Sequence, residues 1–290
     1  MGIIEAIILG IVQGLTEFLP VSSSGHLVLL QKIFNINEPG LFYDTMLHLG
    51  TLTAVFVVLW KDIWALIKKP IQKLTGFLIL ATIPAVIAAL VFGDSIEEIF
   101  KSARFLGFCF LFTTVILITA EILSRKTKNN ELLTLNKEKM TNTEQITAND
   151  LQTGYKNEKT MSWFDALFIG IMQAIAIPPG ISRSGATISG ALFRRLDRDF
   201  AARFSFLLSI PAILGAVTLQ TKDLVKNGAA ESINIAAVTA GTLSAAIIGF
   251  FAVKFMLKII REKSLFGFAV YTGILGVLVI IDQYVTRIVF

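Results

Sequence analysis

The sequence predicts an all-α, polytopic membrane protein built from two inverted repeats, each with one re-entrant helical hairpin and three transmembrane helices. Two observations support this class. Of the 290 residues, 54% are hydrophobic and only 16% are charged, and the mean hydropathy is +0.71, which is high for a soluble domain of this size. The two halves of the chain also share a sequence pattern, which indicates an internal duplication.

The duplication appears when the second half is aligned on the first without a gap, at an offset of 160 residues. In each copy an apolar segment runs into a break rich in Pro, Gly and Ser, and a second apolar segment follows. In a membrane protein this pattern is typical of two half-helices that meet at a loop. The identical pairs are Ala6/Ala166, Gly10/Gly170, Ile11/Ile171, Gln13/Gln173, Ser22/Ser182, Ser24/Ser184 and Gly25/Gly185.

The expected elements follow from segment length. The stretches 3–15 and 23–34 are each too short to cross about 30 Å of hydrocarbon at about 1.5 Å per residue, so they predict a hairpin rather than spans. The polar stretch 124–162 predicts an exposed, mobile cytoplasmic loop without a catalytic role. The first repeat is residues 1–123 (hairpin 3–34, spans about 44–66, 75–93 and 104–123) and the second is 163–290 (hairpin 163–195, spans about 201–219, 236–258 and 265–285).

Three spans per repeat invert the second copy relative to the first, so the two hairpins are expected to enter from opposite faces and to meet near the midplane. Most of the 26 Lys and Arg residues fall on one side of this arrangement, which the positive-inside rule assigns to the cytoplasm. Both termini then lie outside. Because these basic residues stand at the ends of apolar runs, the net charge of +5 does not indicate a nucleic-acid partner.

The two breaks carry residues suited to binding an anion. Ionisable groups at membrane depth cost about 2.5–3.5 kcal/mol each and therefore favour a functional interpretation. Arg183 offers a planar fork that suits phosphate. Small residues let backbone N–H groups converge at a helix N-terminus. The expected phosphate-binding residues, besides Arg183, are Ser22, Ser24 and Gly25 in the first break, and Ser182, Ser184, Gly185 and Thr187 in the second.

The first break also carries acid–base groups. Gln13 and Glu17 lie four residues apart, so on a helix they share a face and could hold a hard divalent cation, Mg²⁺ or Ca²⁺, beside substrate phosphates. His26 is the expected proton-transfer group. Together these residues predict a phosphoryl-transfer site. His48, Asp44 and Glu121 are candidates for supporting it, although a structural hydrogen bond is the favoured interpretation of each.

At these residues the chain resembles the undecaprenyl-diphosphate phosphatase family, the bacitracin-resistance (BacA/UppP) proteins of bacterial membranes. The resemblance covers nearly the whole chain and is strongest in Gln13–His26 and Pro179–Gly190. It implies hydrolysis of undecaprenyl diphosphate to undecaprenyl phosphate and inorganic phosphate. This reaction recycles the lipid carrier for peptidoglycan synthesis and confers bacitracin resistance. It also implies a multi-pass protein of the cytoplasmic (inner) membrane with an active site facing the outer, periplasmic side.

The family motifs, carried over by position, imply a site made of Gln13, Glu17, Ser22, Ser23, His26, Ser182, Arg183, Ser184 and Thr187. The expected catalytic residues are Glu17, His26, Ser23 and Arg183. Position 13 holds Gln where the family also has Glu, so Glu17 is the only carboxylate of that motif. The nucleophile is left open among His26, a serine (Ser23 being preferred) and water.

Two other functions remain open from the residues. A polyprenyl-phosphate transporter or flippase could use the same anion site, because inverted repeats with broken helices are typical of transporters. A phosphatase for shorter phospholipid diphosphates would have the same site chemistry. The expected partners are a polyprenyl diphosphate lipid, whose tail lies in a groove between spans, and membrane lipids. The choice of metal and the oligomeric state, including a homodimer, are also left open.

Overall fold

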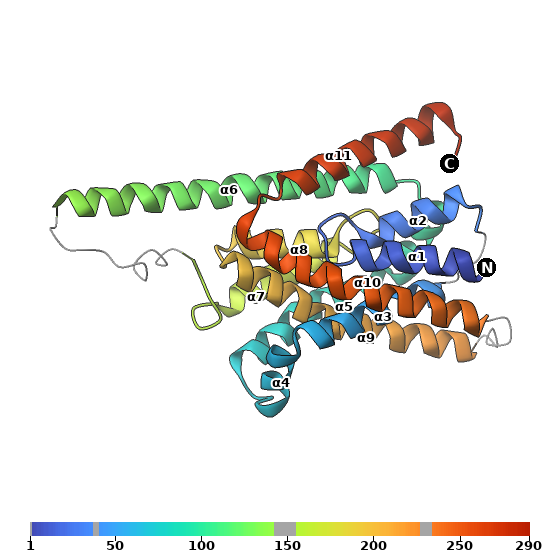
Figure 1. Cartoon of the computed structure of the whole chain (residues 1–290), viewed down its shortest axis with the longest axis horizontal. Coiled ribbons are helices and arrows are strands. Elements are labelled where there is room, and N and C mark those ends of the chain that lie inside the picture. Colours follow the sequence, from blue (N-terminus) through green and yellow to red (C-terminus); the bar gives the residue numbers. More distant parts are fainter. Residues whose placement is uncertain (1, 37–40, 142–154, 227–233) are drawn as a thin grey trace.

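The computed structural model describes residues 2–36, 41–141, 155–226 and 234–290 (Figure 1). These residues confirm the all-helical prediction, since their only β pairing is an isolated bridge between Lys156 and Leu196. The helices are α1 (Ile3–Thr16), α2 (Ser23–Ile33), α3 (Leu41–Val58), α4 (Trp60–Lys68), α5 (Lys73–Ser102), α6 (Leu106–Thr141), α7 (Trp163–Ile175), α8 (Arg183–Phe193), α9 (Arg198–Lys226), α10 (Ile235–Glu262) and α11 (Phe266–Ile281), followed by a π-helical turn, Asp282–Thr286.

The two Ser/Gly breaks of the sequence separate short helices. The chain turns between α1 and α2 at residues 17–22 and between α7 and α8 at residues 176–182. A serine caps the second helix of each pair in the same way. Ser22 Oγ accepts a hydrogen bond from the backbone N–H of Gly25, and Ser182 Oγ accepts one from that of Gly185. These caps satisfy N–H groups that a helix start leaves unpaired, so the serines determine where α2 and α8 begin.

Among the described residues, five helices are long and apolar enough to cross a membrane, namely α5, α6, α9, α10 and α11 over all or part of their length. The pair α3 and α4 would make a sixth span if it were one unit. These helices agree with a multi-pass membrane protein. By contrast, α1 and α7, with 14 and 13 residues, are apolar but shorter than a span.

The span expected at 44–66 is not a continuous helix. α3 ends at Val58, and α4 continues at an angle of 81° to it. Lys61 and Asp62 lie in the first turn of α4, and charged groups disfavour further passage through hydrocarbon. Trp60 and Trp64 are exposed and stacked on the surface of α4, as is typical of a helix at a membrane interface.

The long polar loop also differs from expectation. α6 does not end near residue 123 but continues to Thr141, so part of the predicted loop is helical. Only the part from Leu106 to Thr127 is apolar enough to span. The extension beyond it is rich in Glu, Leu and Lys, whose high helix propensity allows a polar helix to continue. Residues 142–154 of the predicted loop lie outside the described residues.

Small residues let the helices of the bundle pack closely. Gly10 of α1 lies against Gly241 of α10, where a Cβ at position 10 would approach the Gly241 carbonyl oxygen to 2.2 Å. Gly170 of α7 lies in the same way against Ala81 of α5. Close approach through Gly and Ala is the usual packing mode of membrane helices, which gain little from hydrophobic burial against each other. It holds α1 against α10 and α7 against α5, whereas α6 and α11 form a pair along one side (Figure 1).

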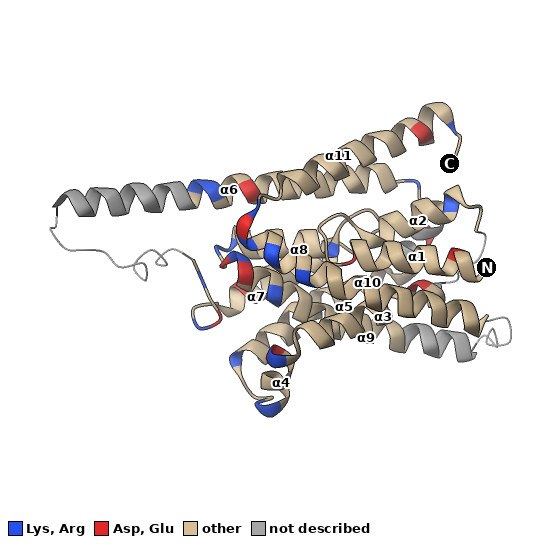
Figure 2. Cartoon of the chain, viewed as in Figure 1, with Lys and Arg blue, Asp and Glu red and all other residues tan. Residues whose placement is uncertain are grey.

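Charged residues lie unevenly over the bundle. Many Lys and Arg residues lie on α4 and around the end where α7 begins and α8 and α10 end, whereas both chain termini lie at the other end (Figures 1 and 2). Buried carboxylates pair with several of these cations. Glu121 binds both Arg125 and Arg198, and Asp165 binds Lys156 and Arg194. The Glu121–Arg198 pair joins α6 to α9, and the Asp165–Arg194 pair joins α7 to the end of α8.

Candidate active site

The turns of the two broken helices touch each other. The backbone N–H of Gly180, in the second turn, donates to Ser22 Oγ in the first at 3.1 Å. A Cβ at Gly25 would lie 2.6 Å from the Phe110 ring and 2.9 Å from Cα of Gly180. Gly180 itself has a φ of +95°, which glycine adopts without strain. Glycine is therefore required at both positions for the two turns to meet.

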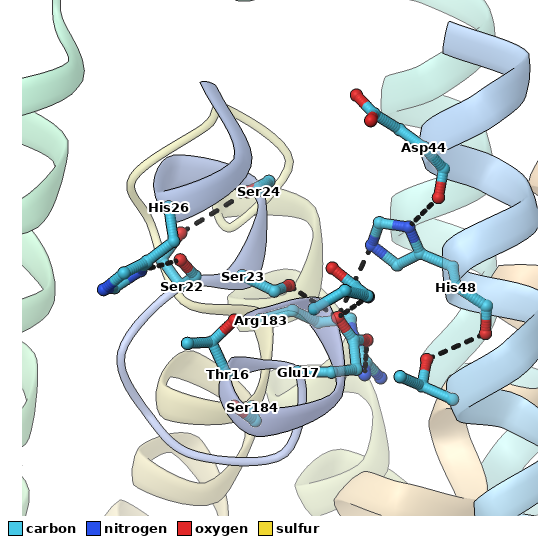
Figure 3. Close-up of polar contacts among 12 residues, drawn as sticks. Thr16, Glu17, Ser22, Ser23, Ser24, His26, Asp44, His48, Arg183 and Ser184 are labelled. Carbon is cyan, nitrogen blue, oxygen red and sulfur yellow. Dashed lines mark hydrogen bonds and ion pairs between the residues drawn. The ribbon is translucent and has the colours of Figure 1, made fainter. Parts of the chain in front are cut away.

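Glu17 lies at the centre of the polar contacts that follow from this meeting (Figure 3). It caps the C-terminus of α1 and is 5% exposed. Its Oε1 accepts a hydrogen bond of 2.7 Å from Nη2 of Arg183, which begins α8. Its Oε2 accepts from Ser23 Oγ at 2.5 Å and from Gln13 Nε2 at 2.9 Å. The structure thus brings together the acid of the first repeat and the arginine of the second.

A fourth helix, α3, contributes to this cluster. His48 of α3 places Nε2 at 3.4 Å from Glu17 Oε2, and its Nδ1 contacts the backbone oxygen of Asp44 at 2.7 Å (Figure 3). The Asp44 carboxylate accepts a hydrogen bond from Gln31 of α2. The sequence motifs do not include His48 or Asp44. The available signal was an ionisable residue within an apolar helix.

These residues, except Gln13 and Gln31, line one pocket of about 220 Å³. Its lining combines polar side chains with apolar residues, which include Leu27 of α2, Ala212, Ile213 and Ala216 of α9, and residues of the second turn. A polar site with an apolar wall suits the headgroup of an amphipathic ligand. The polar lining residues are Glu17, Ser22, Ser23, Ser24, Asp44, Thr45, His48, Ser182 and Arg183.

Two buried atoms of the site have no hydrogen-bond partner among the described residues. Nη1 of Arg183 is a donor without an acceptor, and Oε1 of Gln13 is an acceptor without a donor. Such groups are costly to bury without a partner, so a water molecule, an ion or a ligand is expected beside each. The first requires an anion or another acceptor. The second requires a donor or a cation.

Several predicted phosphate-binding residues do not line the pocket. Ser184 Oγ donates to the backbone oxygen of Leu19, which links α8 to the first turn. Thr187 Oγ1 is fully buried and lies 2.6 Å from Ser205 Oγ of α9. Gly185 is buried beside Pro20, and its N–H caps α8 through Ser182. In the structure these three residues support the packing of α8 rather than the surface of the pocket.

His26 also lies apart from the pocket. Its ring points away from Glu17 and Arg183 (Figure 3). Nδ1 contacts the backbone oxygen of Ser22 at 2.7 Å, and Nε2 contacts the hydroxyl of Tyr271 in α11 at 2.7 Å. The ring also packs edge-on against Phe110. The histidine that lines the pocket is therefore His48, whereas His26 joins the first turn to α6 and α11.

The residues present agree in part with the expected divalent cation. Glu17 and Asp44 place two carboxylates on the pocket wall, whereas Gln13, whose amide oxygen is unpartnered, lies beside Glu17 and is not among the lining residues. Among the described residues, no three His, Cys, Asp or Glu side chains form a metal-binding cluster. A cation would need substrate oxygens as further ligands, which is how Mg²⁺ is usually held beside phosphates.

The second repeat does not reproduce the acid. Gln173, the counterpart of Gln13, is buried, and neither atom of its amide has a partner among the described residues. Position 177, the counterpart of Glu17, is an isoleucine. The duplication thus holds two similar turns with different side chains, of which one supplies the carboxylate and the other the guanidinium.

The fold and the site define a polytopic helical membrane protein whose pocket is lined by a carboxylate, an arginine and several serines from the two turns, and by residues of α3 and α9. The chain belongs to the family "Bacitracin resistance protein BacA", whose family model matches residues 6–278. It is 46% identical over 284 residues to "Undecaprenyl-diphosphatase 4" of Bacillus thuringiensis (strain Al Hakam), with 98% of each chain covered. These matches confirm the family that the motifs indicated.

Similar relatives occur in other organisms. The chain is 44% identical over 284 residues to "Undecaprenyl-diphosphatase" of Carboxydothermus hydrogenoformans, with 98% of each chain covered. It is 38% identical over 303 residues to "Undecaprenyl-diphosphatase" of Methanosphaera stadtmanae, with 97% of this chain and 98% of the relative covered. The similarity therefore spans both repeats and the segment between them.

Proposed function

We propose that this chain is an undecaprenyl-diphosphatase, which hydrolyses undecaprenyl diphosphate to undecaprenyl phosphate and inorganic phosphate. The full-length relatives of that name support the substrate. The observation that carries the chemistry is the Glu17 carboxylate, which contacts the Ser23 hydroxyl through one oxygen and the Arg183 guanidinium through the other, inside one pocket. A nucleophile, a base and an anion-binding group thus lie side by side.

The terminal phosphate of the substrate occupies the polar wall of this pocket. Nη1 of Arg183, which has no protein partner, donates to a phosphate oxygen while Nη2 remains on Glu17. A guanidinium that holds the catalytic carboxylate and the phosphate together positions both groups and stabilises the charge that spreads over the phosphoryl oxygens. The apolar wall contributed by α9 accommodates the start of the prenyl chain.

Ser23 is the nucleophile that the contacts favour. Its oxygen attacks the terminal phosphorus and forms the new O–P bond, while its proton passes to Oε2 of Glu17. The bond from phosphorus to the bridging oxygen breaks, and undecaprenyl phosphate leaves. Water then hydrolyses the phosphoserine and releases inorganic phosphate. Direct attack by water is the alternative, whereas His26 lies on the other side of α2.

A divalent cation, Mg²⁺ or Ca²⁺, completes the site in this proposal. Glu17 and the free amide oxygen of Gln13 would be the protein groups that hold it, together with diphosphate oxygens. When bound, the ion neutralises the charge of the diphosphate and of the leaving group. The residues of the chain orient the substrate and accept the proton.

The helix packing supports an inverted-repeat arrangement. At the 160-residue offset, α1 corresponds to α7, α3 to α9, α5 to α10 and α6 to α11. Under this correspondence the helix contacts of one repeat have equivalents in the other. α1 packs on α10 as α7 packs on α5, α3 packs on α9, and α6 packs on α11. The basic end of the bundle then faces the cytoplasm, and the termini and the mouth of the pocket face outwards. The oligomeric state, including a homodimer, stays open.

Phosphate release tests this function. Purified protein in detergent is mixed with undecaprenyl diphosphate and a divalent cation, and inorganic phosphate is measured for the wild type and for Glu17→Gln. Glu5→Gln is the matched control, because Glu5 lies on the same helix but contacts only the backbone at its start. The proposal requires release that Glu17→Gln abolishes and Glu5→Gln preserves. A folded wild-type protein that releases no phosphate with any cation contradicts it.

Lipid transport is the second candidate, because broken helices around a buried anion site are typical of transporters. The two functions differ in whether inorganic phosphate is released from the diphosphate. A transporter would move undecaprenyl phosphate across a proteoliposome membrane without releasing phosphate from the diphosphate. Measurement of both quantities on the same preparation separates the two functions.

A further inference from the structure

The pocket contains one histidine, His48, which lies outside the two sequence motifs. Its side chain is 26% exposed, and its Nε2 is 3.4 Å from Glu17 Oε2. This is the same carboxylate oxygen that accepts the hydrogen bond from the Ser23 hydroxyl. His48 therefore meets Glu17 at the atom that takes the proton of Ser23 in the proposed function.

The ring of His48 is held in one orientation. Nδ1 lies 2.7 Å from the backbone oxygen of Asp44. A carbonyl oxygen only accepts hydrogen bonds, so Nδ1 must carry a proton and donate it. Nε2 is therefore the ring nitrogen that faces Glu17, and because Nδ1 already carries a proton, Nε2 presents an N–H to the carboxylate only in the doubly protonated imidazolium. One ring nitrogen is hydrogen-bonded to the backbone of its own helix, and the other faces the carboxylate.

Packing and a hydrogen bond hold the part of α3 that carries His48 in place. Thr51 donates to the His48 backbone oxygen at 2.8 Å, and Gly50 packs directly on α10, where a Cβ would lie 2.3 Å from the oxygen of Thr242. Glu17, by contrast, ends α1 and is followed by the turn. The terminal torsion of a glutamate side chain is broad, so contacts rather than rotamer preference determine where Oε2 points.

We propose that His48 is a positioning residue for the phosphatase reaction. As an imidazolium it pairs through Nε2–H with the Glu17 carboxylate and holds it in the orientation in which Oε2 receives the Ser23 proton. This inference depends on the proposed function, because it assigns His48 a role in that reaction. It concerns kcat rather than substrate affinity, since the group that His48 contacts is the base.

Three substitutions test the role by geometry. His48→Ala removes both ring contacts. In His48→Gln the amide nitrogen takes about the place of Nε2, and in His48→Asn it takes about the place of Nδ1. We expect His48→Ala to lower kcat by about tenfold or more with little change in KM, because a misplaced catalytic group is costly. His48→Gln should recover most of the loss, and His48→Asn should not.

The pattern separates positioning from a structural role. If the contact with the Asp44 carbonyl were what matters, His48→Asn would recover activity and His48→Gln would not. That result overturns the proposal, as does an unchanged kcat in His48→Ala or a loss that lies entirely in KM. Thermal unfolding of each variant shows which are folded. If His48→Ala is not folded, the activity of His48→Gln still tests the proposal.

A second measurement does not depend on activity. The chain has only two histidines, His26 and His48, so ¹⁵N-histidine labelling gives two imidazole signals, which the His26→Gln and His48→Gln variants assign. Glu17→Gln should shift the Nε2 resonance of His48 and leave that of His26 in place. Tyr271→Phe is the matched control and should shift only His26, whose Nε2 contacts the Tyr271 hydroxyl.

This measurement distinguishes the two failures. If the wild type releases no phosphate, the proposed function is wrong, and the spectra alone report on the contact of His48. If Glu17→Gln leaves the His48 resonance unchanged, the contact does not exist in solution, and the positioning role is wrong even for an active enzyme.

Discussion

Arg183 donates a hydrogen bond of 2.7 Å from Nη2 to Oε1 of Glu17, although 166 positions separate the two residues. The bond joins the second helix of one broken pair to the end of the first helix of the other. The free Nη1 of the same guanidinium is left for a ligand. One planar side chain thus serves two partners, which a lysine does not reproduce.

Substitution of Arg183 should therefore be poorly tolerated even when the charge is kept. We expect Arg183→Lys to lower kcat/KM for undecaprenyl diphosphate by about tenfold or more, because an ammonium group cannot bind Glu17 and phosphate in the same planar geometry. Arg183→Ala should cost about 100-fold or more. Phosphate release in detergent measures both. Arg203→Lys, at an ion pair with Asp62, should leave activity unchanged, and full activity of Arg183→Lys contradicts the prediction.

Ser23 and Ser24 form a matched pair of neighbours on the pocket wall. Only Ser23 contacts Glu17, whereas the contact of Ser24 is with Ser22 Oγ at 3.4 Å. We expect Ser23→Ala to lower kcat by about 100-fold or more and Ser24→Ala by a few-fold only. Steady-state kinetics on the two purified variants provide the comparison. Equal losses would argue against Ser23 as nucleophile.

Gly25 should not tolerate a methyl group, because a Cβ there would overlap with the Phe110 ring and the backbone of Gly180. We expect Gly25→Ala to destabilise the protein by about 1–3 kcal/mol through overpacking. Gly93→Ala is the control, since nothing lies within 4 Å of a Cβ at that helical position, and Ala is the better helix former. Thermal unfolding in detergent should show a lower Tm for the first variant only.

Asp165, in the first turn of α7 and outside the five spanning helices, should make stability depend on pH. Bonds from Lys156, Ser162 and Arg194 outweigh the effect of burial and lower the pKa of Asp165 to about 2. A lowered carboxylate pKa adds stability that is present above the unfolded value, near pH 4, and is lost as pH falls towards 2. The stability gap between the wild type and Asp165→Asn should therefore narrow between pH 5 and pH 3, as unfolding measurements will show. A constant gap would exclude this linkage.

Divalent cations should be required for activity. We expect EDTA to abolish phosphate release and added Mg²⁺ or Ca²⁺ to restore it, because Glu17 and Gln13 alone offer too few ligands and the diphosphate supplies the rest. Gln13→Glu adds a carboxylate at the unpartnered amide oxygen and should lower the cation concentration needed for half-maximal activity. Full activity after exhaustive chelation would show that the arginine and serine chemistry operates without a metal.

The sequence by itself determined the class of protein and the two places where chemistry was expected. Hydrophobic composition and segment length are enough to predict a helical membrane protein, because lipid leaves backbone polar groups no partner outside the helix. The Ser/Gly breaks could also be predicted from the sequence, because the hydrogen bonds that form them are local. Ser22 and Ser182 cap helices through N–H groups only three residues away.

Only the tertiary structure decided which side chains share the pocket. His48 joins Glu17 because α3 packs beside the first turn, and His26 faces Tyr271 because α11 packs on its other side. Thr187 likewise belongs to the packing between α8 and α9 and not to the pocket. The residue types were visible in the sequence. The face that each presents depends on helices far away in the chain, because several small-residue contacts together determine how those helices cross.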